Sequence, residues 1–406
     1  VMEMRFQRRH QAVHEAPVLA DRIAAHRRGI GRHPLPQEVQ GARFRLGQRH
    51  ALLQHPPPQP GLAVLVAVPV VHRLQPLQRM ADRAFDFLIK QFWDAKHGGA
   101  FWRLEDSGKV LDDSKKIYGQ AFYIYALTEF HRAFKSAEAL QRALALFELI
   151  EKHAHDGEFG GYVEVCRRDW SEAGPEARLS DKDMHEKKSM NNHLHVLEAY
   201  TNLYRETQNP LVEQRLHELV QIFLDRILDA RTGHLHHFFN EEWLVRSDTY
   251  TFGHDIEASW LLCEAAEVLD DPALLARVRA VALQMADKVL AEGVLPDGGL
   301  CYEGKGGNII DAGRECWPQA EAIVGFLNAF QLSGQPKYVV AAERVWDYVE
   351  RNLIDRMHGE WFWRINEDGK PDAKLPKMSE WKGPYHVSRA CLETMRRLSD
   401  LASRAG

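Results

Sequence analysis

The sequence predicts an all-α protein, an (α/α)6 barrel of paired inner and outer helices joined by short β-hairpins. Apolar residues recur at helical spacing in ten segments from Met80 onward. Pieces rich in glycine and aromatic residues separate these segments, and they contain Gly98, Gly160, Gly233, Gly298 and Gly359. The glycines are 62, 73, 65 and 61 residues apart, a period that accommodates one hairpin and two helices per repeat.

The ten expected helices alternate between inner and outer positions. The first, Met80–Trp93, is amphipathic, with Phe85, Leu88 and Phe92 on one side. The others are Lys116–Phe134, Ala137–His153, Met190–Glu206, Leu211–Leu228, His254–Leu269, Pro272–Ala291, Cys316–Leu332, Pro336–Leu353 and His386–Ala402. Because six pairs close the ring, the first pair is missing or degraded. One period before Gly98 there is no Gly-aromatic hairpin.

The first 79 residues differ in composition from residues 80–406, and the two are expected to be separate regions. Residues 1–79 contain twelve Arg, no Lys and four acidic residues, a balance of +8, which leaves 40 basic against 53 acidic residues, or −13, for the rest. They also hold nine of the 18 Pro and seven of the 21 His. Three interpretations compete: a targeting segment, a disordered basic arm, or a stretch translated in the wrong reading frame. The coincidence with the missing helix pair favours the third.

Composition narrows the possible partners. A hydrophobic fraction of 45% and ten Trp indicate a globular core, and a net charge of −5 gives no reason to expect nucleic acid or an anionic membrane. The longest uncharged apolar run, Gly61–Val71, is too short to span a bilayer and contains Pro69. The five cysteines are scattered and form no CxxC pair, which predicts reduced thiols in a cytoplasmic protein and no zinc site.

Three expected helix starts each carry a histidine, and these form the candidate site. His254 and Glu257 lie three residues apart on one helical face, and Asn191 and His195 lie four apart at a second start. His386 opens the last helix. An imidazole in the first turn lies near the positive end of the helix dipole, which lowers its pKa and favours the neutral, basic form. If the three starts meet in space, they form a pocket for proton transfer.

Three other histidines have plainer explanations. His193 is two residues from His195 and points away from it, so we expect a packed core or surface side chain. His236 and His237 are adjacent on an expected hairpin and point to opposite faces. Neither an HExxH motif nor clustered carboxylates accompany them, so no metal site is expected.

Two aromatic rings and one loop are expected beside the histidines. Trp317 opens an inner helix, and Trp381 lies five residues before His386. A ring at the mouth of a polar pocket is a usual platform for a sugar face, although core packing must account for most of the ten Trp. The charged segment Asp169–Lys188 could form a loop over the pocket. From it Asp183 could point inward, or it could be a solvated charge.

The residue types at the helix starts favour proton transfer over hydrolysis. A glycosidase on this fold would need two opposed carboxylates, whereas the expected inner-helix starts present histidines. Imidazole pairs suit the removal and return of a proton near neutral pH.

A set of motifs supports this interpretation. They are Lys116–Phe122 (KIYGQAF), Leu179–Asp183 (LSDKD), Asn191–Tyr200 (NNHLHVLEAY), Gly253–Trp260 (GHDIEASW), Trp317–Ala322 (WPQAEA) and Pro384–His386 (PYH). Through these motifs, residues 80–406 resemble the N-acylglucosamine 2-epimerase superfamily, most closely its cellobiose 2-epimerase branch. The motifs follow one another in the same order as in that family. The family fold is the (α/α)6 barrel, and the resemblance implies neither a metal nor a redox cofactor.

The resemblance also implies roles for single residues. His254 and His386 look like the two acid/base residues, and His195 looks like the residue that stabilises an enediolate oxygen. The implied sugar contacts are Asn191, Glu257, Trp317, Trp381, Tyr118 and Asp183. The chain departs from the family pattern at Cys316, where related proteins often carry a second Trp. It departs again in residues 1–79, which contain no match to the family's early inner helix with its active-site Arg.

The expected function is therefore epimerisation at C2 of an aldose, the reducing-end glucose of a β-1,4 disaccharide such as cellobiose. An aldose–ketose isomerase of the mannose isomerase type would use the same residues. A catalytically inactive sugar-binding protein is the third possibility, motivated by the missing helix pair. The expected partner is a small sugar, and the expected state is a monomer or homodimer.

Overall fold

The computed structural model describes residues 75–175 and 177–405. The chain forms two compact units, one of residues 25–91 and one of residues 1–24 and 92–406. In the first unit, residues 75–87 are helical and continue into the π-helical turn η1 (Leu88–Phe92). Residues 75–79, which the composition groups with the aberrant segment, thus belong to a helix. The prediction for the rest of residues 1–79 lies outside the described part of the chain.

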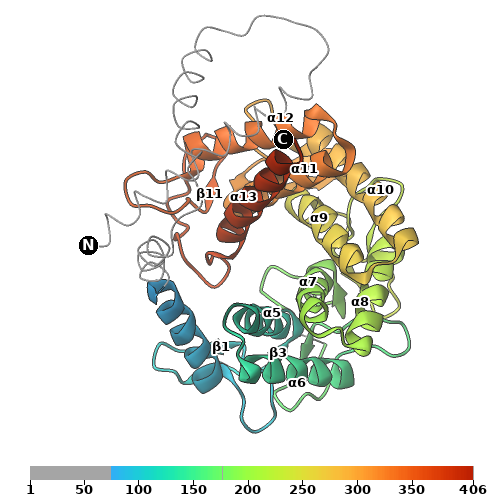
Figure 1. The fold of residues 1–406 in the computed structure, drawn as a ribbon, viewed down its shortest axis with the longest axis vertical. Helices are drawn as coiled ribbons and strands as arrows, with labels where there is room; N and C mark the ends of the chain where they lie inside the picture. The colour runs from blue at the N-terminus through green and yellow to red at the C-terminus, as the bar shows by residue number, and fades with distance from the viewer. Residues whose placement is uncertain (1–74, 176, 406) are drawn as a thin grey trace, which may run out of the picture. The chain divides into compact units, whose positions relative to one another are not determined.

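The second unit is built from concentric inner and outer helices (Figure 1). The inner helices are α5 (Ile117–Phe134), α7 (Met190–Thr207), α9 (Phe252–Leu269), α11 (Cys316–Ser333) and α13 (Tyr385–Ala405). The outer helices are α6 (Ala137–His153), α8 (Pro210–Ile222), α10 (Pro272–Lys288) and α12 (Pro336–Tyr348). Helices α7, α9 and α11 are buried over most of their circumference, whereas the outer helices bury one apolar face and expose a charged one. The predicted barrel of paired helices is confirmed.

Three outer helices end in a π-helical turn directly before a glycine-rich hairpin. These turns are η2 (Phe223–Ile227), η3 (Val289–Gly293) and η4 (Val349–Leu353). The helix at residues 75–87 ends in the same way and has the sequence position of an outer helix. The two helices that a closed ring still requires are therefore an outer and an inner helix from neighbouring pairs, and not a single pair. Neither of the two is among the elements of residues 75–175 and 177–405.

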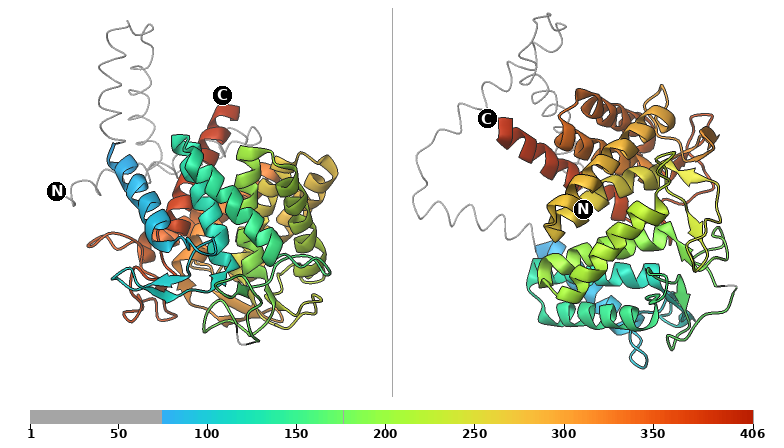
Figure 2. Two further views of the ribbon diagram at one scale, coloured as in Figure 1. Left: turned by 90° about the horizontal axis from the view of Figure 1, so that it is seen from below. Right: turned by 90° about the vertical axis from the view of Figure 1, so that its right-hand side faces the viewer.

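Short antiparallel strands tie each repeat to the next, at one end of the helices (Figure 2). Strands β3 (Lys115–Lys116), β5 (Lys188–Ser189), β7 (Tyr250–Thr251) and β10 (Arg314–Glu315) lead directly into inner helices. They pair respectively with β4 (Val165–Cys166), β6 (Phe238–Phe239), β8 (Glu303–Lys305) and β11 (Arg364–Ile365) of the following hairpin. Strand β9 (Asn308–Asp311) extends β8, and β1 (Arg103–Leu104) pairs with β2 (Val110–Asp112).

Each inner helix from α5 to α11 is also held to the hairpin that precedes it. The fourth residue of the helix accepts a hydrogen bond from a hairpin backbone N–H, and the four acceptors are Gln120, His193, Asp255 and Gln319. Their donors are Ala100, Tyr162, Leu235 and Leu300, at 2.8 to 2.9 Å. These bonds satisfy buried backbone groups and set the height of each helix start relative to its hairpin. The side chains that follow on each helix are positioned by the same bonds.

The contact at α9 is the only one of the four in which an ion pair reinforces the backbone bond. His234 lies at the hairpin position that is glycine in the other three repeats. Its ring stacks on that of Tyr250, with the ring centroids 3.6 Å apart. Its Nδ1 is 2.7 Å from Asp255 and its Nε2 is 3.0 Å from Glu292. Burial lowers the pKa of His234, but the two carboxylates together raise it by more, so the net pKa lies above the usual 6.5. The imidazolium form is therefore favoured.

The helix bounds agree with the sequence prediction to within a few residues. In the described part of the chain no helix is both long and apolar enough to cross a membrane. All five cysteines are unpaired, as expected, and only Cys391 is not fully buried. On α13 two apolar side chains are exposed, Leu392 at 63% and Met395 at 42%.

The ion pairs of His234 predict a pH-dependent contribution to stability. Because its pKa is raised on folding, this contribution is complete below the unfolded pKa of 6.5 and is lost as the pH rises through the higher folded pKa. His234→Gln should lower the free energy of unfolding by about 2 kcal/mol at pH 6, and the deficit should shrink toward pH 9. Denaturant titrations at several pH values measure it. His217→Gln, on an outer helix, is the matched control, and a deficit independent of pH would contradict the assignment.

Candidate active site

The three histidines of the candidate site lie at the hairpin ends of different inner helices. His195 is on α7, His254 on α9 and His386 on α13. The ring of Trp317, from the start of α11, contacts two of them, with centroids 4.7 Å from His254 and 5.3 Å from His386. Tyr385 lies 6.1 Å from His195 and 4.6 Å from His386. The structure thus brings the three helix starts together, as the sequence led us to expect.

Each of these histidines has its Nδ1 engaged by a neighbouring side chain. His195 Nδ1 is 3.1 Å from Glu198, and His386 Nδ1 is 2.7 Å from Glu321. Carboxylates accept hydrogen bonds, so both imidazoles carry a proton on Nδ1. His254 Nδ1 is instead 2.6 Å from the hydroxyl of Thr251. With Nδ1 occupied in all three rings, Nε2 is the nitrogen left for chemistry.

Arg389 on α13 joins the carboxylates behind the histidines. Its Nη1 donates to Glu198 at 2.5 Å, and its Nη2 donates to Glu257 at 2.6 Å and to Glu321 at 2.7 Å. Tyr385 completes the group, since its hydroxyl donates to Glu198 and accepts from Arg389. One guanidinium therefore connects side chains of α7, α9, α11 and α13.

The electrostatics of this group divide the carboxyls into two kinds. Burial raises the pKa of Glu198, but the opposing effect of Arg389 and His195 is larger, and the net pKa is lowered to about 2. The pKa of Glu321 is likewise lowered, because Arg389 and His386 outweigh its burial. Burial and the neighbouring Glu321 raise the pKa of Glu257 well above its usual value. We infer that Glu257 is the protonated member when the other two are ionised.

Burial is also the main influence on the two histidines beside Trp317. It lowers the pKa of His254 well below 6.5, and the neighbouring His237, His195 and His386 lower it further. It lowers the pKa of His386 as well, although Glu321 opposes the shift. Neutral imidazoles are the favoured forms of His254 and His386, as predicted, and burial lowers both pKa values.

Aromatic rings from three segments form a connected group next to His195. Tyr118 on α5 has its ring centroid 5.0 Å from His195 and 6.2 Å from Trp381. Trp381 is 37% exposed and also packs against Trp102, 6.0 Å away. Trp102 belongs to the first hairpin and was not singled out from the sequence. The site thus has one indole that contacts two histidines and a second, accessible indole beside Tyr118, which contacts the third.

The remaining predicted sugar contacts lie at or near the same end of the helices. Asn191 is the second residue of α7 and is half-buried. Asp183 is half-buried in the loop before β5 and accepts a hydrogen bond from Ser180. Its charge contributes to the raised pKa of Tyr118, whose main cause is burial. The role of Asp183 as a sugar contact stays a prediction.

His193, His236 and His237, for which no catalytic role was expected, differ in their surroundings. His193 is fully buried and bonded at both nitrogens, to Tyr162 N at 2.9 Å and to Ser189 O at 2.6 Å, which confirms the expected core role. His236 and His237 do not share a metal-binding geometry. His237, however, lies 5.8 Å from His254, ring to ring, a proximity that the sequence did not reveal.

One group among the described residues has the spacing of a metal site. Ligand atoms of Glu257, Glu321 and His386 lie within 4.8 Å of one another. Nη2 of Arg389 donates to both of these carboxylates, so a cationic group already occupies the position between them. The expectation that no metal is needed stays a prediction.

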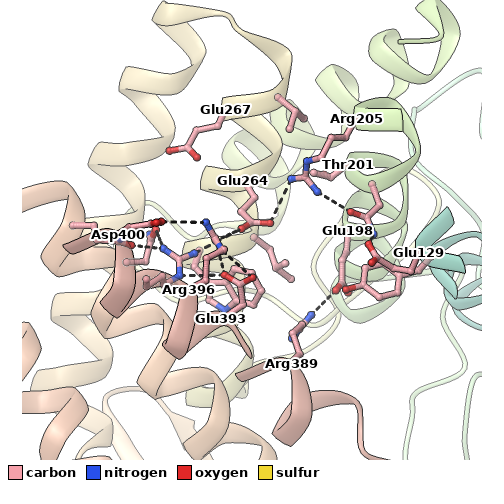
Figure 3. Close-up of a pocket in the computed structure, with 18 of the residues that line it drawn as sticks. Glu129, Glu198, Thr201, Arg205, Glu264, Glu267, Arg389, Glu393, Arg396 and Asp400 are labelled. Atoms are coloured by element: carbon pink, nitrogen blue, oxygen red, sulfur yellow. Dashed lines mark hydrogen bonds and ion pairs between the residues drawn. The ribbon is translucent and has the colours of Figure 1, made fainter. Parts of the chain in front are cut away.

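Behind Arg389 the interior of the helix ring contains a charged cavity of about 600 Å³ (Figure 3). Six arginines and six acidic residues line it. The acidic residues are each bonded to an arginine, for example Glu264 to Arg205 and Arg396, and Glu393 to Arg397. The ion pairs leave the lining electrically balanced, and Arg389 with Glu198 separates this cavity from the histidines.

Sequence reasoning missed the residues that organise the site. Glu198, Glu321 and Arg389 received no role, although Glu198 lies three residues after His195 and Arg389 three residues after His386. That spacing places each pair on one helical face and was an available signal. The contact between Glu321 and His386 joins residues 65 positions apart and had no such signal.

Fold and site together define an (α/α)6-barrel enzyme with three histidines gathered at the hairpin ends of its inner helices. Residues 70–390 match the family model described as N-acylglucosamine 2-epimerase (GlcNAc 2-epimerase). The chain belongs to this family.

Known relatives agree with this assignment. The cellobiose 2-epimerase of Bacteroides fragilis is 43% identical over 322 residues, covering 78% of this chain and 81% of that protein. The cellobiose 2-epimerase of Dictyoglomus turgidum is 37% identical over 321 residues, covering 78% and 80%. The solved cellobiose 2-epimerase of Bacillus thermoamylovorans superposes with a TM-score of 0.75 at 38% identity, covering 80% and 82%. A D-mannose isomerase structure, at 21% identity and a TM-score of 0.67, shares the fold.

Removing Arg389 should destabilise the protein strongly near neutral pH. Arg389→Met leaves three carboxyls buried without their cation, which costs about 3–5 kcal/mol in the free energy of unfolding. The lowered pKa of Glu198 stabilises the wild type above pH 4.5 and ceases to do so as the pH falls toward 2, so the deficit should narrow on acidification. Arg396→Met, at a half-exposed position, should cost much less. Equal losses for the two variants would contradict the hub role.

Proposed function

We propose that this protein is a sugar 2-epimerase that inverts C2 of the reducing-end glucose in cellobiose-type β-1,4 disaccharides. The observation that carries the proposal is the pair of imidazoles, His254 and His386, whose rings both contact the Trp317 indole. The two-base chemistry of an epimerase requires a proton acceptor and a proton donor on opposite faces of one carbon. The family membership and the cellobiose 2-epimerase relatives support the same reaction and substrate class.

The reaction begins once the sugar ring has opened to expose the C1 aldehyde. A neutral imidazole, His254 or His386, removes the proton from C2 through its Nε2. The C–H electron pair forms the C1–C2 double bond, and the carbonyl electrons move to O1, which gives a cis-enediolate. The other imidazole, in its protonated form, returns a proton to the opposite face of C2. The two histidines exchange protonation states in each turnover, and exchange with solvent restores them.

The surrounding residues have matching roles in this proposal. Glu321 holds the Nδ1 proton of His386 and supports its protonated form. Glu198 holds the Nδ1 proton of His195, and His195 stabilises the developing negative charge on the enediolate oxygen. Trp317 and Trp381 offer ring faces to the sugar. Asn191, Glu257, Tyr118 and Asp183 are the proposed hydrogen-bonding contacts.

No cofactor takes part in the proposed steps, since proton transfer needs only the imidazoles. A cytoplasmic location and a monomeric or homodimeric state stay predictions.

The aldose–ketose isomerase alternative differs only in the return of the proton to C1, and chromatography of the products separates the two. A protein that binds cellobiose in a calorimeter without turnover would correspond to the inactive sugar-binding alternative.

The first test follows the proton. Cellobiose incubated with the enzyme in D2O should yield an epimer that carries deuterium at C2, because the imidazole protons exchange with solvent between removal and return. NMR or mass spectrometry of the isolated product measures the label. An epimer free of deuterium at C2 would rule out proton transfer through exchangeable groups, and a ketose product would replace the epimerase by the isomerase.

The second test removes each proton carrier. His254→Ala and His386→Ala should each lower kcat by about 10² to 10⁴, since each deletes a general acid/base. His217→Ala on the outer helix α8 is the matched control and should retain wild-type turnover. His193→Ala is also expected to keep most of the turnover per folded molecule, but at reduced stability because His193 holds a hairpin. Near wild-type rates in either active-site variant would refute the two-base assignment.

A further inference from the structure

Thr251, the residue before α9, does not use its hydroxyl in the way its position would suggest. It is the N-cap, with φ −111° and ψ 129°, yet its side chain makes no capping hydrogen bond. Ser189 at the same position before α7 does cap, accepting from Asn192 N at 3.1 Å. A threonine N-cap normally contributes about 1 kcal/mol in this way. At α9 that contribution is absent because the hydroxyl binds His254 Nδ1, 2.6 Å away.

The same threonine contacts His237 through both its backbone and its side chain. Thr251 N–H donates to His237 Nε2 at 3.2 Å, and Thr251 Oγ1 lies 3.5 Å from that nitrogen. A backbone N–H can only donate, so His237 Nε2 is an acceptor, and the proton of this neutral ring is on Nδ1. Burial and the neighbouring His236 lower the pKa of His237 to about 4, which keeps the acceptor available at neutral pH.

The direction of the hydrogen bond to His254 follows from the chemistry required of its ring. If Nε2 is to take a proton, Nδ1 must already carry one, and Nδ1–H then donates to Thr251 Oγ1. When His254 is fully protonated, Nδ1–H still donates. The hydroxyl of Thr251 is therefore an acceptor in both states, and its own proton needs a second acceptor. Among the described residues, the polar contact of that hydroxyl besides His254 is His237 Nε2, 3.5 Å away, whose one lone pair it shares with the backbone N–H of Thr251.

We propose that Thr251 and His237 form a hydroxyl–imidazole relay that holds His254 in the Nδ1–H tautomer and so directs its basic Nε2 to the substrate. Both are positioning residues, because they act through His254. The relay rests on the proposed epimerisation for its purpose, but the tautomer it imposes exists without substrate.

The relay makes the two acid/base groups unequal. The carboxylates of Glu321 and Glu198 hold His386 and His195, and the negative charge of Glu321 favours the imidazolium form of His386. A neutral hydroxyl holds His254, so its orientation is set without a charge that would favour protonation. The charged or titratable groups nearest to His254 are the imidazoles His195, His237 and His386. A carboxylate at position 251 would raise the basicity of His254 and favour retention of its proton.

The first experiment observes the tautomer directly and needs no activity. In protein labelled with ¹⁵N-histidine, the ring signals of His254 are those lost in His254→Gln. They should show a protonated Nδ1 and an unprotonated Nε2 in the wild type. Thr251→Val, which keeps the shape but removes the hydroxyl, should give a mixture of tautomers, and Thr251→Ser should restore the wild-type pattern. A wild type protonated on Nε2, or a Val variant with unchanged signals, would overturn the relay.

The second experiment measures its consequence for turnover. Thr251→Val should lower kcat about ten- to a hundredfold with KM within about threefold, while Thr251→Ser retains most of the rate. His237→Phe should lower kcat less, and His237→Gln, which offers a carbonyl oxygen in place of Nε2, should recover part of it. These His237 variants carry the test if Thr251→Val does not fold.

A deuterium measurement separates positioning from general damage. In D2O, a weakened His254 donates slowly, so the enediolate formed by His386 returns more often to the starting sugar and labels it. The Thr251→Val reaction is started from each epimer in turn. The ratio of deuterium in the unreacted sugar to deuterium in the new epimer should rise for one starting epimer and not for the other. Glu321→Gln should show the opposite preference. Equal changes from both epimers would refute the relay, whereas a wild type that makes no epimer would refute the proposed function and leave the NMR result to decide the relay.

Discussion

The site depends on one buried guanidinium. Arg389 binds Glu198, Glu257 and Glu321 at 2.5 to 2.7 Å, and these three residues are on three different inner helices. Bringing three carboxyls together inside a protein is unfavourable unless a cation compensates for their lost hydration. Arg suits this position because its planar group offers several donors in fixed directions, which a lysine ammonium does not. The starts of α7, α9, α11 and α13 thus converge on one side chain.

The orientation of the histidines follows from this convergence. Glu198 binds Arg389 through Oε1 and His195 through Oε2, whereas Glu321 accepts from both Arg389 and His386 through Oε1. The interaction that keeps these carboxylates ionised therefore also sets the tautomers of His195 and His386. His254 stands outside the carboxylate network and is oriented by Thr251. Nδ1 is thus engaged in all three imidazoles, but only in His195 and His386 is the partner charged.

The hairpins provide the second constraint. A polar side chain at the fourth position of an inner helix bonds to the preceding hairpin in four repeats, although the residue is Gln twice, His once and Asp once. The contact is retained while its chemistry varies. In the repeat that carries His254, the hairpin contributes both His234, which binds Asp255, and His237, which binds Thr251. The helix bearing this histidine is therefore held on two sides.

The sequence by itself determined the repeat, the helix bounds and the helix starts that carry histidines. These features are local, because apolar periodicity, glycine-rich turns and spacings of three or four residues are properties of short segments. Tertiary structure alone decided that Glu321 holds His386 and that Arg389 joins three helices. It also decided that His237, set aside as one of an adjacent pair, lies beside His254. Those contacts join residues tens to more than a hundred positions apart, and their distances depend on how the helices close around a common centre, which no local pattern specifies.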